Sequence, residues 1–287
     1  MMNITQQFRP GKILLAVDGS PSAKAAAFAA IQIASETRWH LHALYVVDIT
    51  QVFDPYSNVS QELSELGDEM PFEQKVKLFE EQGTLALAEV EELCQQMSVP
   101  VSTEMVFGGV PVNILQISKG YDLLAIGHMG NRHAKEPKHL GSNFQQIARH
   151  AHVPLLIGSS QYASQKFQRV LLAYDGSQLS HEAFRWAENL QSLFKAIMVL
   201  SVERENVRNH TWLADRHEEI DESALTQYEF IQAAGNPGHM IASKAVTEQA
   251  DLILMGAYQH KNLLRWARHS TIDAVLRETN LPVLAIK

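Results

Sequence analysis

The residues best suited to chemistry in this chain are two glycine clusters separated by ten residues. Gly127–Gly130 (GHMG) precedes the interval from Asn131 to Leu140, and Gly141-Ser142 then opens the helical run Asn143–His150. Glycine lets a backbone approach a phosphate closely, and the first amides of a helix attract anions. Taken alone, such spacing also fits a turn followed by a helix cap. Its position after a predicted strand favours a phosphate-binding loop.

Histidines gather around the same glycines, at His128, His133 and His139. No tight spacing of metal ligands, such as H-E-x-x-H or C-x-x-C, accompanies them, so we expect no metal site. When protonated, these imidazoles would instead be able to contact a phosphate. Arg132 and Lys135 offer the same contact, although solvated loop charges are the simpler interpretation of both.

The motifs of common catalytic sites are missing from the sequence. It contains no G-x-x-x-x-G-K-[ST] loop, no G-x-S-x-G elbow and no clear nucleophile with an orienting base. The carboxylates of Asp54, Glu62 and Asp68 lie in a run of charge that is typical of a solvated surface. We therefore do not expect an enzyme.

The elements that would position the glycine loop occur twice. Residues 13–18 (ILLAVD) and 170–175 (VLLAYD) both lead into Gly-Ser, and Tyr121–Gly127 (YDLLAIG) has a counterpart in Ala250–Gly256 (ADLILMG). The repeated unit has the size of a complete domain, so the chain is a tandem duplication of one fold.

Short apolar runs alternate with helical patterns in each half. This alternation predicts an α/β fold of two tandem, doubly wound, parallel-sheet domains of the Rossmann-like kind. Ligands of such sheets bind at the carboxyl ends of the strands, here just after Val17, Val47, Phe107 and Ile126. The expected helices are Ala23–Ser35, Phe72–Met97, Ser180–Phe194 and a short one near Trp212–Ser223, and the expected inner strands are Leu41–Val47, Ser102–Phe107, Ala196–Val202 and Gln227–Ile231.

The two halves differ most after their second strands. The first half has a long, polar and acidic segment, Asp48–Met70, which we interpret as a mobile loop in preference to a lid. Between the halves lies the polar stretch Ser159–Gln168. It divides the chain into a first domain of residues 1–160 and a second domain of residues 167–287.

Composition limits the class of protein. The chain has 287 residues, 46% of them hydrophobic, and a formal net charge of −8, which argues against a nucleic-acid partner. The single Cys94 cannot form an internal disulfide and fits a reducing compartment. No apolar run reaches the roughly 18 residues of a membrane span, and Met1–Pro10 lacks a signal-peptide core. We expect a cytoplasmic protein whose partners are small molecules or proteins.

On these motifs, essentially the whole chain resembles the universal stress protein family in its tandem two-domain, UspA-like form. Nucleotide-binding members of that family carry G-x-x-G, nine residues and then G-S or G-T, preceded by an Asp that ends the first strand; the loop here holds ten residues. The resemblance implies that the first half binds ATP, with Mg²⁺, with Asp18 and Val46 at the adenine end. The binding residues that it implies are Ala16, Asp18, Val46, Gly127, Met129, Gly130, Gly141, Ser142 and Asn143.

The second half departs from the family pattern. Gly256–Gln259, nine residues and His269-Ser270 keep the spacing but replace two of the three glycines with residues that carry side chains. Asp175 persists, although an Asp before Gly-Ser is also simply a turn and a cap. We expect this half to bind no nucleotide and to act as a structural partner, with Val153–Ile157 and Leu281–Ile286 pairing in an intrachain pseudo-dimer.

The function implied by the resemblance is a stress-response nucleotide sensor or regulator with at most slow ATP hydrolysis. Its protein partners are not specified by the sequence, and a homodimer is left open. The alternative is a scaffold or metabolite-binding stress protein that has lost nucleotide binding and uses a pocket between its domains.

Overall fold

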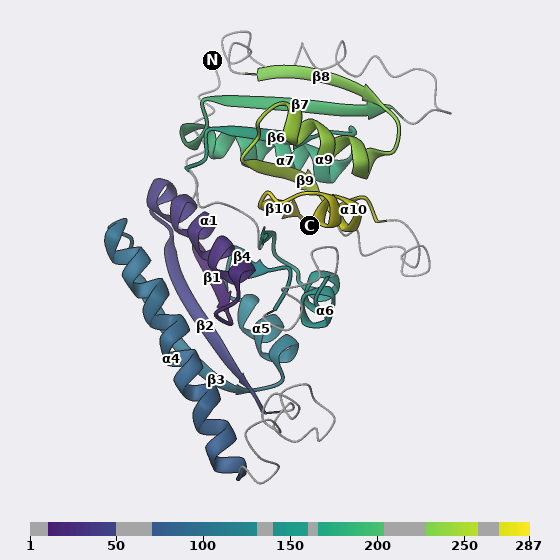
Figure 1. Ribbon diagram of the computed structural model, residues 1–287. Coiled ribbons are helices and arrows are strands. Elements are labelled where there is room, and N and C mark those ends of the chain that lie inside the picture. Colours follow the sequence, from purple (N-terminus) through teal and green to yellow (C-terminus); the bar gives the residue numbers. More distant parts are fainter. Residues whose placement is uncertain (1–10, 50–70, 131–139, 160–165, 204–227, 258–269) are drawn as a thin grey trace. The chain divides into compact units, whose positions relative to one another are not determined.

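The computed structural model describes residues 11–49, 71–130, 140–159, 166–203, 228–257 and 270–287 (Figure 1). They form two compact units, one spanning Pro10–Tyr162 and the other built on Ala163–Lys287. The long segment 50–70 and the expected helix near Trp212–Ser223 lie outside the described residues.

The first unit is a five-stranded parallel sheet with strand order β3-β2-β1-β4-β5. Helices α1 and α4 contact each other and cover one face, and α5 and α6 cover the other, so the sheet is doubly wound (Figure 1). In chain order its elements are β1 (Lys12–Val17), α1 (Pro21–Thr37), β2 (His40–Asp48), α4 (Phe72–Gln96), β3 (Val101–Gly108), α5 (Val110–Ser118), β4 (Leu123–Gly127), α6 (Ser142–His150) and β5 (Leu155–Gly158).

The second unit repeats this plan with strand order β10-β9-β6-β7-β8, again parallel. Helix α7 packs on β6, β9 and β10, while α9 packs on β7 and β8. Its elements are β6 (Arg169–Ala173), α7 (Gln178–Asn189), a 3₁₀ turn (Gln191–Leu193), β7 (Ala196–Glu203), β8 (Tyr228–Ala234), α9 (Pro237–Thr247), β9 (Leu252–Gly256), α10 (Thr271–Glu278) and β10 (Val283–Ile286).

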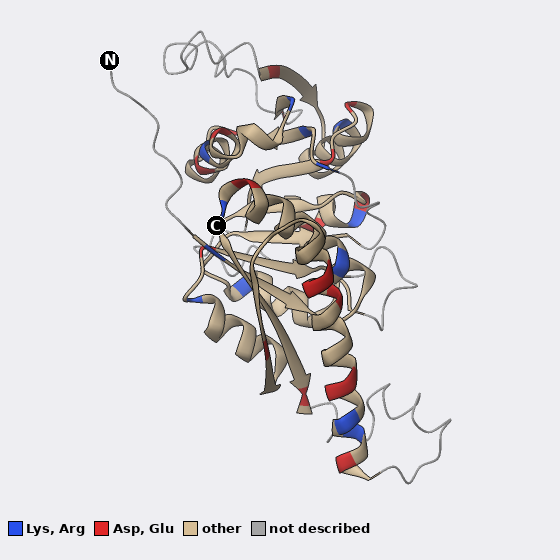
Figure 2. Ribbon diagram, turned by 90° about the vertical axis from the view of Figure 1, so that its left-hand side faces the viewer, with Lys and Arg blue, Asp and Glu red and all other residues tan. Residues whose placement is uncertain are grey.

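The core of each sheet follows from strands that are buried on both faces. Successive residues of β1, such as Ile13, Leu14 and Leu15, are fully buried, as are Leu123 and Leu124 of β4. Parallel strands covered by helices on both sides read as continuous apolar runs. Figure 2 accordingly shows most charged residues on helices, with the central strands largely free of charge.

The described elements agree with the sequence predictions except near their ends; β8, for example, continues to Ala234, three residues beyond the predicted Ile231. Helix α1 starts two residues before Ala23, because the Ser20 side chain accepts the amide of Ala23 and caps it at Pro21. Helix α7 ends at Asn189, short of the predicted Phe194, because Phe194 adopts an extended backbone and its ring packs 6.4 Å from that of Phe167. Within the part of the chain that the structure describes, no helix is long and apolar enough to cross a membrane.

Candidate functional site

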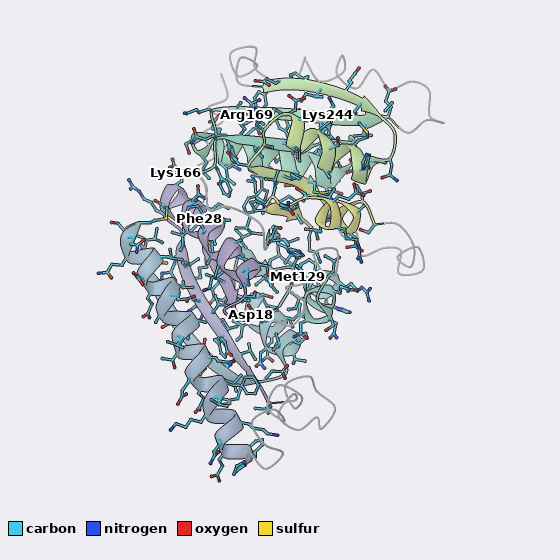
Figure 3. The ribbon with its side chains drawn as sticks, in the orientation of Figure 1. Asp18, Phe28, Met129, Lys166, Arg169 and Lys244 are labelled. Atoms are coloured by element: carbon cyan, nitrogen blue, oxygen red, sulfur yellow. The ribbon has the colours of Figure 1, made fainter. Side chains whose placement is uncertain are left out.

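The turn after β1 and the loop after β4 meet at the carboxyl ends of these paired strands. Asp18 directly follows β1, and Gly130 lies three residues beyond the end of β4. A Cβ atom placed on Gly130 would lie 3.3 Å from Asp18 Oδ2. Residues more than a hundred positions apart in sequence thus face each other, and Figure 3 labels Asp18 together with Met129 of the loop.

Asp18 is a crowded carboxylate that still has access to solvent. Its Oδ1 accepts the amide of Ser20 at 2.9 Å, and the side chain is exposed on one side. The surrounding protein atoms partly desolvate it, which raises the pKa of Asp18 above its ordinary value despite the hydrogen bonds from Ser20. Desolvation, with a smaller contribution from the Asp18 charge, also raises the pKa of the neighbouring Tyr45 to about 12. Tyr45 is therefore uncharged at neutral pH, and Asp18 is the polar group next to it.

The second glycine cluster lies against the first. The Gly141 amide donates to the carbonyl of His128 at 3.0 Å, and a Cβ on Gly141 would lie 3.7 Å from the Gly130 nitrogen. The two clusters are therefore in contact although ten residues separate them in the sequence. The residues between them, 131–139, lie outside the described part of the chain.

Helix α6 presents its first amides at this point. Gly141 is its N-cap and offers no side-chain acceptor, and the first helical hydrogen bond runs from the Gln145 amide to the Gly141 carbonyl at 2.9 Å. The amides of Ser142 and Asn143 thus precede the hydrogen-bonded ladder of the helix. Ser142 is the exposed first residue of the helix and not its cap. Helix α1 differs, because the Ser20 side chain caps it, so of the two helices that start at this site α6 is the one whose first amides remain available for an anion.

Gly127 faces a helix. A Cβ on Gly127 would lie 2.6 Å from the backbone nitrogen of Ala23, which no rearrangement of a flexible side chain would relieve. Gly158 of the neighbouring β5 has the same role, since its Cβ would lie 2.4 Å from the nitrogen of Ala26. These two glycines let the start of α1 pack directly over the ends of β4 and β5.

Met129 shapes the loop through its backbone. Its side chain is buried, its amide donates to Ser22 Oγ at 3.3 Å, and its carbonyl accepts the Ser22 hydroxyl. Ser22 Oγ also lies 3.2 Å from Ser20 Oγ. The start of α1 and the loop after β4 are therefore joined by hydroxyl hydrogen bonds.

Ala16 and Val46 are apolar residues of the two strands next to Asp18. Both are buried strand residues, and Val17 is paired with Tyr45, so the next position places Asp18 beside Val46. Asn143, in the first turn of α6, is half-buried. Apolar strand residues thus lie beside Asp18, and the first amides of α6 lie near the glycines.

His128 is a structural residue of this loop. It is buried, and its Nδ1 donates to the carbonyl of Gly158 at 2.7 Å. Burial lowers the pKa of His128 below its ordinary value, so at neutral pH it supplies no positive charge to a phosphate. The other residues proposed for phosphate contacts, Arg132, Lys135, His133 and His139, lie outside the described residues. Among the side chains that are described, no three His, Cys, Asp or Glu residues are grouped to hold a metal ion.

Comparison with known proteins identifies the family. The sequence model of the universal stress protein family matches residues 10–158 and again residues 166–287. The chain belongs to the universal stress protein family. It is 28% identical over 287 residues to universal stress protein Slr1230 of Synechocystis, covering 96% of this chain and 99% of that one.

This universal stress protein is also similar to a second sequence relative and to a solved structure. Universal stress protein MJ0531 of Methanocaldococcus jannaschii is 33% identical over 149 residues, which is 51% of this chain and 80% of that protein. The crystal structure of a universal stress protein from Archaeoglobus fulgidus superimposes with a TM-score of 0.72 at 19% identity, covering 97% of both chains. The latter likeness shows the fold.

The two universal stress protein domains differ in which glycines of the loop they contain. Gly256 is the second-domain counterpart of Gly127, and a Cβ there would lie 2.7 Å from Leu179 Cβ and 3.0 Å from the Leu179 carbonyl carbon. The retained glycine is thus the one that packs a helix onto a strand in both domains. The two replaced positions, Gln259 and His269, correspond to Gly130 and Gly141 and lie outside the described residues.

The Asp after the first strand also differs between the domains. Burial alone would raise the pKa of Asp175, but hydrogen bonds from Ser177 and Ser180 outweigh it, so the pKa of Asp175 is lowered. The Ser177 amide donates to Asp175 Oδ1 at 3.0 Å. Asp175 is therefore a carboxylate that stabilises its turn. Asp18, in contrast, has a raised pKa and faces Gly130.

Proposed function

We propose that this universal stress protein binds ATP, with Mg²⁺, in its first domain and acts as a stress-response nucleotide sensor. The observation that carries the proposal is the meeting of Asp18, Gly130, Gly141 and the α6 N-terminus at the carboxyl ends of β1 and β4. In a doubly wound sheet, this is where ligands bind.

The chemistry at the two ends of the site suits the two ends of a nucleotide. The amides of Ser142 and Asn143 and the side-chain-free surface at Gly130 and Gly141 suit a chain of phosphates. Asp18 and the buried Val46 suit a base, which needs a polar edge and apolar faces. Mg²⁺ would be held largely by the phosphates and water, because it dehydrates reluctantly.

The signal would be the binding of ATP and not its hydrolysis. No lysine of a Walker-type loop is available to stabilise a leaving phosphate. Steady-state phosphate release should therefore stay well below about 1 s⁻¹. In this account the second domain, without glycines at 259 and 269, binds no nucleotide and contributes a structural surface.

Calorimetric titration of the full chain with Mg·ATP tests the proposal. We expect about one ATP per chain and loss of binding in Gly130→Val, because a branched side chain would project between Asp18 and the phosphates. Gly127 is unsuited to this test, since its substitution would disturb the packing of α1.

Two controls are available. Gly120→Val makes the same change in a turn of the same domain, where a Cβ would have ordinary contacts, and Gln259→Ala changes the second domain. Both variants should bind ATP as the parent does. Two equal sites, binding that survives Gly130→Val, or no binding by correctly folded parent protein would each contradict the proposal.

A further inference from the structure

A second group of reactive side chains lies at the opposite end of the strands in the first domain. His40 and His42 alternate along the start of β2, and parallel pairing puts Ser102 of β3 in register with His42. Ser102 Oγ lies 2.9 Å from His40 Nε2 and 2.8 Å from His42 Nδ1. The other nitrogen of His42, Nε2, lies 3.0 Å from Glu104 Oε2. The glycine loop, in contrast, follows the carboxyl end of β4.

The hydrogen bonds of this cluster have one consistent arrangement when both imidazoles are neutral. The Glu104 carboxylate only accepts, so His42 Nε2 carries the hydrogen and His42 Nδ1 is an acceptor. Ser102 then donates its hydroxyl hydrogen to His42 Nδ1 and accepts from His40 Nε2. The result is a serine hydroxyl aimed at a base that is itself oriented by a carboxylate.

The base is held in place, while the hydroxyl can be reached. The His42 ring stacks on Tyr121 with centroids 5.8 Å apart, and its side chain is only 13% exposed. Ser102 is partly exposed, and Glu104 is 49% exposed. A nucleophile, a fixed base within hydrogen-bond reach and a third group that orients the base are the parts of an activated serine.

We propose that Ser102 is a nucleophile for acyl transfer from small carboxylic esters, with His42 as its general base and Glu104 as a positioning residue. Ser102 Oγ attacks the ester carbon as its proton passes to His42 Nδ1. The bond from carbon to the alkoxide leaving group then breaks, and that leaving group takes the proton from His42, which leaves Ser102 acylated. Water, deprotonated by the same imidazole, releases the carboxylic acid and restores the serine.

Labelling of the intact chain with a fluorophosphonate probes this serine directly. The Ser102 oxygen would form a bond to phosphorus, fluoride would leave, and the proton would pass to His42. We expect one stable adduct per chain, which peptide mapping places on Ser102 and which does not form in urea-unfolded protein. The Ser102→Ala variant should take up no label.

The role of the base is tested by variants that keep the size of the side chain. His42→Gln should slow labelling by about a hundredfold or more, the usual contribution of a general base. Glu104→Gln keeps an acceptor for His42 but loses the charge that favours the imidazolium. It should slow labelling less than His42→Gln does. Glu104→Asp, which keeps the charge, should recover more of the parent rate than Glu104→Gln, and a merely structural role would not produce this difference.

The matched control is Thr103→Ala. Thr103 is the next residue of β3, and its hydroxyl donates to Glu91 of α4 on the other side of the sheet, away from His42. This variant should be labelled at the parent rate, and thermal unfolding should confirm that every variant is folded. Absence of a Ser102 adduct on the folded parent, or equal labelling of His42→Gln, would overturn the proposal.

Discussion

At the scale of single residues, glycines that look alike in the sequence have different roles. Gly127 lets α1 pack against β4, whereas a Cβ on Gly130 would meet only the end of the Asp18 side chain. We expect Gly127→Ala to destabilise the first domain by about 1–3 kcal/mol, the usual cost of overpacking. Urea unfolding should show this loss in Gly127→Ala and little change in Gly130→Ala. Equal destabilisation of both variants would contradict the division of roles.

The equivalent aspartates of the two domains, Asp18 and Asp175, should respond in opposite ways when their charge is removed. A raised pKa means that ionised Asp18 lowers the free energy of unfolding. This loss of stability is absent at low pH and grows as the pH rises through that pKa. Asp18→Asn should therefore raise the unfolding temperature at neutral pH, with the gain vanishing by about pH 4. The pKa of Asp175 is lowered, so its ionised form stabilises the native state. This stabilisation is present at neutral pH and is lost on acidification. Asp175→Asn should consequently lower the unfolding temperature at neutral pH, and calorimetry across this pH range checks both variants.

At the scale of elements, the starts of α1 and α6 are built differently. Ser20 Oγ accepts the Ala23 amide at 3.1 Å, whereas Ser142 is simply the first residue of α6. Ser20→Ala should cost about 1 kcal/mol of stability, as loss of an N-cap usually does. Ser142→Ala should cost far less in the absence of ligand. Denaturant titrations of the two variants make the comparison, and a larger loss for Ser142→Ala would show that the wrong helix start has been assigned as capped.

Helix α4 buries the single cysteine of the chain. Cys94 is fully buried, and desolvation, with a smaller contribution from the Glu91 charge, raises its pKa to about 11. Because the thiolate is the reactive form, the native thiol should react with iodoacetamide far more slowly than the same thiol in urea. Mass spectrometry over time measures both rates. Comparable rates would show that α4 opens readily from β2 and β3.

The sequence was sufficient for the strands and helices that the structure describes, because each depends on local pattern, whereas the phosphate-binding role of the glycine loop stays a prediction. It did not reveal the cluster of His40, His42, Ser102 and Glu104. Histidines two apart on one strand and a Ser-x-Glu on another become neighbours only through the register of β2 and β3. Nor could local pattern separate Gly127 from Gly130, since that distinction depends on where α1 packs.

At the scale of the whole molecule, the duplication gives two domains with separate cores and with different residues at the positions of Gly130 and Gly141. If ATP binds only in the first domain, it should stabilise that domain alone, by about 2.7 kcal/mol at a hundredfold excess over Kd. Hydrogen exchange should show added protection in β1 and β4 and none in their counterparts β6 and β9. Equal protection of both domains would mean that the second domain also binds the nucleotide or that the two unfold together.

The hydroxyl bridge of Ser22 has a consequence for ligand choice. Because Ser22 joins the turn that carries Asp18 to the loop at Met129, the separation between Asp18 and the α6 amides is set by the protein before any ligand arrives. A molecule that contacts both ends must match that separation. If the proposed site binds ATP, its ligands would therefore be selected by length. Those that span from Asp18 to α6 would contact both ends, and shorter ones would contact only one.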